Sequence, residues 1–339
     1  MKVRFLVTPV GLMMGNVKAA GRLMKALAGE GVDVSDHIDA WDFDILHVHT
    51  PVPPQNIIIV KKAKRRGIRV IVHSHTTVED AEGTFTGSSA FSGVVSKYLS
   101  YFYNLGDLVL SPSAWTKGTL ERRGVVAPIK VLSNGIDLGR FRFDAERRMR
   151  FRERYGFAES EKVVYSIGVV CVKKGIASYP EVVNAVDGVK FVWVGQLSLL
   201  YQPLKVNRSM KRCGQRVRFL HDVGDIVDAH CGCDIFFMPS FAENQGIAVL
   251  EALAIGRPVV ARDLEVYRGL LENGKSALLC RDGAEFAAAI GKIKSDDALA
   301  GNLVVGGKGA LADHDMRKVV RELIAIYESL LAEKRGVRA

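Results

Sequence analysis

Short runs of hydrophobic residues alternate along the chain with segments in which apolar residues recur every three or four positions. Many of the short runs are continuous, which is typical of parallel strands buried on both faces of a sheet. The helical spacing between them predicts amphipathic helices. The strands predicted in this way are "VRFLVT", "ILHVH", "RVIVHSH", "LVLSPS", "IKVLS", "VVYSIGVV", "VKFVWVG", "RVRFL", "DIFFMPS", "PVVA" and "SALLC".

Helices are predicted at residues 17–28, 55–66, 247–255 and 284–294. Repeated strand–helix units predict doubly wound α/β sheets, and 339 residues suit two domains of roughly 150 residues. We place the first domain at 1–155 and the second at 156–314, with the boundary in the arginine-rich stretch after "SNGIDLGRF". A last helix within 315–339 is expected to pack back on the first domain. Two such domains facing each other leave a cleft lined by strand carboxyl ends.

The composition is that of a globular protein, since 48% hydrophobic and 25% charged residues exclude disordered and collagen-like chains. No apolar run reaches the roughly 18 residues of a membrane-spanning helix. Five cysteines without the spacing of a disulfide framework indicate free thiols in a reducing cytoplasm. Cys231 and Cys233 follow His230, so a zinc site stays an alternative there, although a second pair of ligands is missing.

Positive charge is concentrated in the first half of the chain. Residues 1–155 hold 23 Lys and Arg against 15 Asp and Glu, a net charge of +8, and the remainder holds 24 against 22, a net charge of +2. The runs "KKAKRRGIR" and "GRFRFDAERRMRFRER" are either solvated helix faces or a surface for an anionic partner. No zinc finger or RNA-binding aromatic signature accompanies them, so we expect an anionic membrane surface and no nucleic acid.

The segment "FSGVVSKYLSYFYNLGD" is rich in aromatic and aliphatic side chains. These side chains form either one face of the core or the lining of a path for an apolar acceptor. Together with the basic neighbours, the second interpretation indicates a protein that lies on a membrane without crossing it.

The stretch "SFAENQGIAVLEALAIGRPVV" follows a predicted buried strand and continues into a predicted helix. Gly246 would stand at the start of that helix, where free N–H groups and the helix dipole bind anions. Glu243 on the loop and Glu251 on the helix are suited to accept hydrogen bonds from sugar hydroxyls on either side of a diphosphate. The alternative is a capped surface helix with incidental glutamates.

A second strand is followed by the turn Lys173-Lys174-Gly175. A lysine at such a turn can neutralise the charge that builds up on a departing phosphate. A solvated loop without a ligand is the alternative.

Histidines stand at the carboxyl ends of two predicted strands. His47 and His49 end "ILHVH", and His73 and His75 end "RVIVHSH", so each pair lies on one face of its strand. Histidines in this position are suited to hydrogen-bond a sugar or to transfer a proton, although a single one is often structural.

Together these residues resemble the retaining glycosyltransferases of the GT-B fold that carry the E-x7-E signature, the glycosyltransferase family 4-like enzymes. Glu243 and Glu251 match the two signature glutamates, Lys174-Gly175 match the K-G of the donor domain, and His75 matches the histidine of the first domain. "DILHVHTP", "SPSAWTKGTL" and "VLSNGIDLGRF" also look like landmarks of this family and occur in its order. Within the family, the segments around the K-G and E-x7-E motifs look most like diacylglycerol glucosyltransferases that build membrane glycolipids.

The resemblance implies transfer of a hexose, glucose, from a UDP-sugar to a lipid hydroxyl with retention, without a metal or a cofactor. It implies a protein attached peripherally to the cytoplasmic face of the membrane. The residues implied as catalytic are His75, Lys174 and Glu243. Those implied on the donor side are Lys173, Asn244, Gln245, Gly246, Ile247 and Glu251. Those implied on the acceptor side are Gly11, Gly15, His49 and His73.

One position departs from the family pattern. Val169 stands where the family has an arginine, five residues before Lys174. Arginine holds a diphosphate through two parallel hydrogen bonds, so its absence weakens donor binding or shifts the role to Lys173. Two alternatives therefore stay open, namely an enzyme of the same fold with a soluble or protein acceptor, and a catalytically silent GT-B binding protein.

Overall fold

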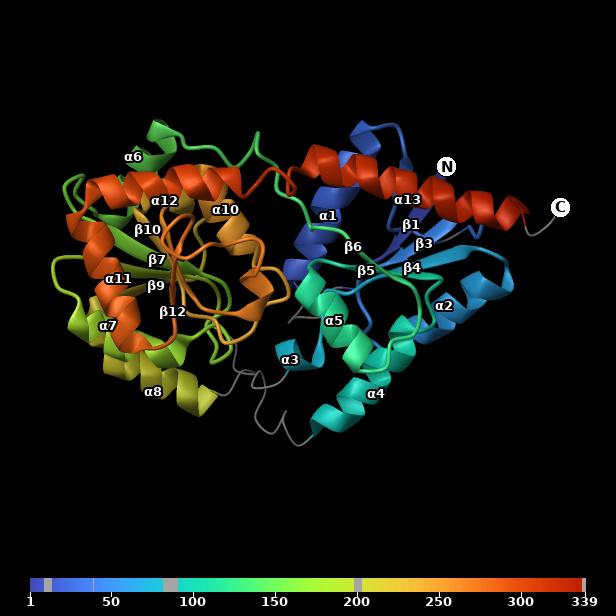
Figure 1. Ribbon diagram of the computed structural model, residues 1–339, viewed down its shortest axis with the longest axis horizontal. Coiled ribbons are helices and arrows are strands. Elements are labelled where there is room, and N and C mark those ends of the chain that lie inside the picture. Colours follow the sequence, from blue (N-terminus) through green and yellow to red (C-terminus); the bar gives the residue numbers. More distant parts are fainter. Residues whose placement is uncertain (9–13, 39, 82–90, 198–202, 337–339) are drawn as a thin grey trace. The chain divides into compact units, whose positions relative to one another are not determined.

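The computed structural model describes residues 1–8, 14–38, 40–81, 91–197 and 203–336 (Figure 1). These residues form two compact units. Unit 1 contains the described residues up to Gly135 and those from Asp313 onward, and unit 2 contains the described residues from Ile136 to Ala312. None of the described helices is both long enough and apolar enough to cross a membrane.

Unit 1 is built on a six-stranded sheet in which every neighbouring pair of strands is parallel. Its short edge strand β2, "DVS", is the strand that the hydrophobic pattern misses. The strands, in spatial order, are β2 (Asp33–Ser35), β1 (Lys2–Leu6), β3 (Ile45–Val48), β4 (Arg69–His73), β5 (Leu108–Ser111) and β6 (Ile129–Val131).

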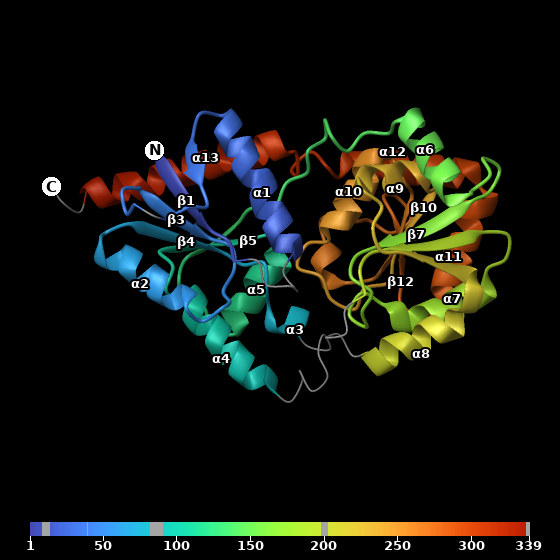
Figure 2. The same ribbon diagram turned by 180° about the vertical axis from the view of Figure 1, so that it is seen from behind.

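Helices cover both faces of the unit 1 sheet (Figures 1 and 2). On one face, α1 (Met14–Gly29) and α13 (Met316–Gly336) bury their apolar side chains against β1, β3 and β4. On the other face, α2 (Asn56–Arg65), α4 (Ser92–Tyr103) and α5 (Ala114–Arg122) do the same. A short helix α3 (Val78–Ala81) follows β4. The C-terminal helix α13 is thus part of the first core, although its residues follow unit 2 in the chain.

Unit 2 repeats this plan with a second parallel six-stranded sheet. Strands β10, β7 and β8 are fully or almost fully buried, as their continuous apolar sequences predict. The strands, in spatial order, are β12 (Leu278–Cys280), β11 (Val259–Arg262), β10 (Ile235–Met238), β7 (Val163–Ile167), β8 (Lys190–Val194) and β9 (Val217–Leu220).

One face of this sheet packs against four helices around Tyr179, Trp193 and Phe286: α7 (Tyr179–Ala185), α8 (Pro203–Cys213), α11 (Gly283–Ser295) and α12 (Asp297–Gly309). The remaining helices of the unit are α6 (Ala145–Tyr155), α9 (Ile226–Gly232) and α10 (Ile247–Ile255). The short 3-10 turns are η2 (Ile176–Ser178), η3 (Gly214–Arg216) and η4 (Glu265–Tyr267). The arginine-rich stretch after "SNGIDLGRF" forms α6, which packs on α9 of the same unit.

The predicted fold class is confirmed, because both sheets are parallel and are flanked by helices. Each predicted strand run overlaps an observed strand, and each of the four predicted helices is present. Gly11, expected on the acceptor side, lies outside the described residues. Gly15 is described and lies in the first turn of α1.

Candidate functional site

The loop between β10 and α10 carries the glutamate motif of unit 2. Gly246 is the N-cap of α10, with a left-handed backbone angle φ of 84°. A Cβ at this position would lie 2.8 Å from Cε1 of Tyr267, so a larger residue meets both backbone strain and a buried ring. Because the N-cap residue is a glycine, it supplies no side-chain hydrogen bond to the first N–H groups of the helix, and such groups at a helix start can bind an anion.

The lysine turn after β7 packs against the same loop. Gly175 has a φ of 88°, and a Cβ on it would lie 2.2 Å from the carbonyl oxygen of Pro239. The backbone N–H of Phe241 donates a hydrogen bond to the carbonyl oxygen of Lys173 at 2.7 Å. This backbone hydrogen bond joins the two segments, and it therefore fixes the backbone position from which the side chain of Lys174 extends. Val169, on the same turn, is half-buried.

Lys174 and Glu243 form an ion pair across these two segments. Lys174 Nζ lies 2.6 Å from Glu243 Oε1, and the two side chains are 22% and 9% exposed. A short charge-assisted contact of this kind is stronger than a surface ion pair because little water screens it. The arrangement holds the positive charge of Lys174 beside the start of α10. A diphosphate bound there would be stabilised by the lysine and by the helix dipole.

Glu251 lies on α10 and belongs to a different network. His230 Nε2 is 3.4 Å from Glu251 Oε2, and His230 Nδ1 is 2.7 Å from the hydroxyl of Tyr165. Burial raises the pKa of Tyr165 well above its ordinary value, so its hydroxyl keeps its proton and can donate to Nδ1. The proton on the ring then belongs on Nε2, which donates to the carboxylate. Tyr165 and His230 thus orient Glu251.

Two further buried hydroxyls belong to this part of unit 2. Ser240 Oγ and the hydroxyl of Tyr267 have no hydrogen-bond partner within the described part of the chain. Burial raises the pKa of Tyr267 well above its ordinary value, and the negative charge of Glu243 adds to this effect. Neither hydroxyl is engaged by a described residue. Sequence reasoning missed Tyr165, Ser240 and Tyr267, since each is a single polar residue within or beside an apolar run.

The four strand-end histidines of unit 1 form one buried cluster, here called the histidine array: His47, His49, His73 and His75. Strands β3 and β4 are neighbours, with His47 paired to Ile71, so the two His pairs lie side by side on one sheet face. His49 Nδ1 is 2.9 Å from His75 Nε2, and His47 Nδ1 is 2.7 Å from the hydroxyl of Tyr327 on α13. The ring centroids of His73 and His75 are 4.2 Å apart.

Burial keeps the histidine array neutral. It lowers the pKa of His75 to about 4, and the pKa values of His47, His49 and His73 lie well below the ordinary value for the same reason, with mutual repulsion adding to it. All four side chains are at least nine-tenths buried, and His75 is the most exposed at 7%. The array can therefore accept or donate hydrogen bonds as neutral imidazoles at neutral pH.

The structure thus gathers the predicted residues into two sets, with Lys174 and Glu243 joined in unit 2 and His49, His73 and His75 in unit 1. The possible zinc site at Cys231 and Cys233 is not assembled. Both cysteines are free and buried, and the nitrogens of His230 are engaged by Tyr165 and Glu251. Among the described residues, three metal-ligating side chains come within 4.8 Å of one another only at His47, His49 and His73.

Comparison with known families assigns both halves of the chain. The family model described as Glycosyltransferase Family 4 matches residues 19–140, and that described as Glycosyl transferases group 1 matches residues 161–296. The first segment lies mostly in unit 1 and the second in unit 2, so the resemblance extends over both parts of the chain.

Characterised relatives point in the same direction. The chain is 30% identical to the processive diacylglycerol alpha-glucosyltransferase of Acholeplasma laidlawii over 315 residues, which cover 92% of each chain. It is 22% identical to the alpha-galactosylglucosyldiacylglycerol synthase of Streptococcus pneumoniae over 92% of this chain and 84% of that protein. The crystal structure of Anabaena HepE in complex with UDP-glucose has the same fold, with a TM-score of 0.81 at 18% identity over 97% of this chain and all of that one.

The two parallel sheets, the paired family models and the full-length relative confirm the expected resemblance. The chain therefore belongs to the family 4 glycosyltransferases of the GT-B fold, close to the enzymes that glycosylate lipids.

Proposed function

We propose that this glycosyltransferase moves a hexose, glucose, from a UDP-sugar to the hydroxyl of a lipid acceptor, with retention of configuration, at the membrane surface. The observation that carries the donor half is the contact of 2.6 Å between Lys174 Nζ and Glu243 Oε1 beside the start of α10. The acceptor half is supported by the relative that glucosylates diacylglycerol, at 30% identity over nearly the whole chain.

The donor is held in unit 2 through charges and hydroxyl contacts. Glu251, oriented by His230, accepts hydrogen bonds from the ribose hydroxyls. Glu243 and the backbone N–H groups of residues 245–247 hold the sugar and the phosphate, with Lys173 and Asn244 beside them. The UDP-glucose complex of HepE, a protein of the same fold, supports this class of donor.

Transfer breaks the bond between the anomeric carbon and the diphosphate oxygen and forms a bond from that carbon to the acceptor oxygen. The proton of the acceptor hydroxyl passes to the departing diphosphate oxygen. Lys174 and the start of α10 stabilise the negative charge on the departing diphosphate. They supply the positive charge that a magnesium ion brings in other sugar transferases, so the reaction requires no metal. His75, kept neutral by burial, contacts the sugar from the acceptor side, and the acceptor attacks the face from which UDP departs.

An exposed surface of unit 1 supports a lipid acceptor. Helices α2 and α4 cover the same face of the sheet, and Lys61 Nζ lies 5.5 Å from the centre of the Tyr101 ring. The α2–α4 surface, as we call it here, consists of five exposed side chains of these helices: Ile58, Lys61, Val94, Lys97 and Tyr101. Ile58 and Val94 are 68% and 69% exposed. Apolar side chains between lysines are suited to the headgroup region of an anionic membrane.

The segment around α4 has a buried side and an exposed side. Leu99, Phe102 and Tyr103 are buried in the core, whereas Val94 and Tyr101 are exposed. The five cysteines are free thiols, which suits a protein on the cytoplasmic face of the membrane.

The test is transfer from a panel of UDP-sugars to vesicles that contain diacylglycerol, with and without a chelator, followed by mass spectrometry of the lipid product. We expect a monohexosyl lipid from UDP-glucose that forms equally well with chelator, and an α-linked sugar in its NMR spectrum. A product on a soluble or protein acceptor alone would overturn the lipid assignment. Neither transfer nor slow hydrolysis of any UDP-sugar would identify a silent binding protein, the alternative that Val169 favours.

A further inference from the structure

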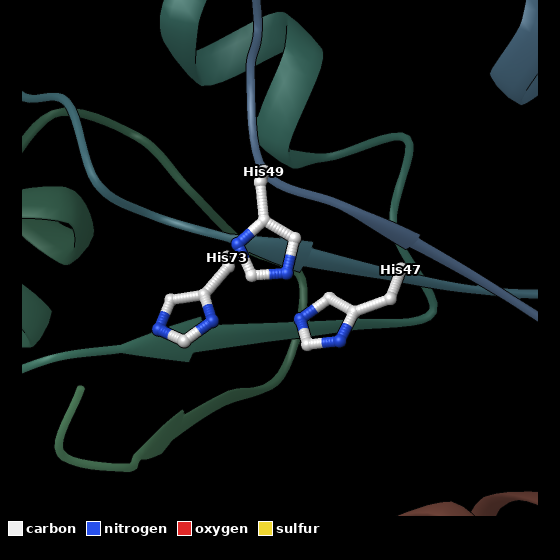
Figure 3. A group of neighbouring side chains, drawn as sticks. All are labelled: His47, His49 and His73. Atoms are coloured by element: carbon white, nitrogen blue, oxygen red, sulfur yellow. The ribbon is translucent and has the colours of Figure 1, made fainter. Parts of the chain in front are cut away.

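Three rings of the histidine array present nitrogens without partners. Figure 3 shows His47, His49 and His73 with one nitrogen of each ring turned toward the others. The Nε2 atoms of His47 and His49 and both ring nitrogens of His73 are buried and have no hydrogen-bond partner in the described part of the molecule. One ligand atom from each ring lies within 4.8 Å of the other two. A buried ring nitrogen without a hydrogen-bond partner lowers the stability of the fold, so a ligand that binds these nitrogens would stabilise it.

The partners of the opposite ring nitrogens decide which atoms carry lone pairs. Tyr327 lies 2.7 Å from His47 Nδ1, and His75 lies 2.9 Å from His49 Nδ1. If each Nδ1–H donates to its partner, each Nε2 is an unprotonated acceptor. The opposite assignment would bury an N–H group on Nε2, and no described residue accepts a hydrogen bond from it. A hydrogen bond from the distal ring nitrogen is the arrangement that orients metal-binding histidines in known sites.

We propose that His47, His49 and His73 bind one divalent transition-metal ion of the Zn²⁺ class. Neutral imidazole is a preferred ligand of zinc, copper, nickel and cobalt, whereas magnesium and calcium require oxygen ligands. Three protein ligands leave a fourth position for water or hydroxide, which offsets part of the charge of the ion. The three ligands belong to unit 1, whereas the Lys174–Glu243 pair belongs to unit 2.

The geometry requires only a local adjustment. A tetrahedral ion at about 2.0–2.1 Å from each nitrogen sets the nitrogens about 3.3 Å apart. The separations of up to 4.8 Å therefore have to shrink when an ion binds. His73 is the last residue of β4 and His49 directly follows β3, so the ion would join two adjacent strand ends.

The test uses the full chain without an affinity tag, stripped with a chelator and titrated with Co²⁺ or Zn²⁺ alone. We expect one ion per chain, visible absorption typical of four-coordinate Co²⁺, and a higher unfolding temperature with metal. His73→Phe should weaken binding at least tenfold. Tyr327→Phe keeps all three ligands and removes only the partner of His47, and it should weaken binding by roughly 10–100-fold.

The control is His37→Ala, which removes an exposed histidine of the same unit and should leave binding unchanged. The thiolate-to-cobalt absorption in the near ultraviolet identifies any ion held by Cys231 or Cys233 instead. If the wild type binds no ion at micromolar concentration, or if wild type and both variants bind equally well, the proposal is wrong. If His73→Phe fails to fold, the metal affinity of Tyr327→Phe decides whether the proposal holds. None of these readouts depends on sugar transfer, so they stand apart from the proposed function.

Discussion

Lys174 Nζ lies 2.6 Å from Glu243 Oε1, which joins two loops 69 residues apart at the carboxyl ends of β7 and β10. The two strands are neighbours in the sheet, so their loops meet at one edge. Beside the hydroxyl binding that we propose for Glu243, this contact holds the side chain of Lys174 in place. A diphosphate that enters this site finds the positive charge already oriented.

Lys174→Met should abolish most sugar transfer. Loss of a fixed charge that stabilises a departing anion costs roughly 10²–10³ in kcat. Glu243→Gln should lose activity as well, and the double variant should be little worse than either single one, since the two act as a unit. Initial rates with UDP-glucose and diacylglycerol vesicles measure this.

The control for this pair is Lys162→Ala, which breaks an exposed ion pair to Asp297 in the same unit. Exposed pairs contribute little, so its activity should equal that of the wild type. Circular dichroism verifies that Lys174→Met is folded. If folded Lys174→Met transfers sugar at the wild-type rate, Lys174 has no role in the reaction.

Tyr165→Phe should raise the KM for the UDP-sugar more than it changes kcat. Without the tyrosine hydroxyl, His230 no longer has a fixed proton position from which to donate to Glu251. A lost hydrogen bond to a charged group costs about 1.5–3 kcal/mol, which corresponds to a rise of roughly tenfold or more in KM.

The matched control is Tyr179→Phe in the same unit. It also removes a buried hydroxyl, which in this case is bonded to Ser166 and not to the Glu251 network. Its KM should stay near the wild-type value although its stability falls. An equal rise of KM in both variants would mean that Tyr165 acts through stability alone.

Gly175→Ala should destabilise unit 2 far more than an ordinary glycine substitution. Its φ of 88° costs about 1–3 kcal/mol for any other residue. In addition, the new Cβ would lie 2.2 Å from the carbonyl oxygen of Pro239, a contact that only a backbone shift relieves. Gly156→Ala is the control, because Gly156 has a φ of 65° and open space around it. Thermal unfolding should give a clearly larger decrease for Gly175→Ala, and equal decreases would contradict the steric argument.

Sequence patterns predict most of the fold, because parallel strands such as β7 and β10 need unbroken apolar sequences and stand out from their surroundings. The edge strand β2 has three residues and little burial, so it leaves no such pattern. The predicted positions of Glu243 on a loop, Glu251 on a helix and Lys173-Lys174 in a turn agree with the structure, whereas His49 and His75 lie just beyond the strands that they were expected to end. The order of the strands in the sheet decides which of these residues are in contact. The spacing of residues along the sequence carries no information about that order.

The contacts of Glu251 illustrate this limit. Its partner His230 comes from α9 and Tyr165 from β7, and only long-range packing brings the three together. In the same way, the two pairs of histidines become one array because β3 lies beside β4. The role of Tyr327 depends on the return of α13 to unit 1, and the helical pattern of that segment does not reveal which sheet face it covers.

Charge reversal on the α2–α4 surface should release the protein from anionic membranes. Each lysine near such a surface contributes about 1 kcal/mol, so Lys61→Glu with Lys97→Glu should weaken binding to phosphatidylglycerol vesicles by at least roughly thirtyfold. The control Lys18→Glu with Lys25→Glu changes the net charge equally on exposed positions of α1. Vesicle flotation at low and high salt measures both. An equal loss in the control would mean that the total charge of the protein, and not this surface, recruits it to the membrane.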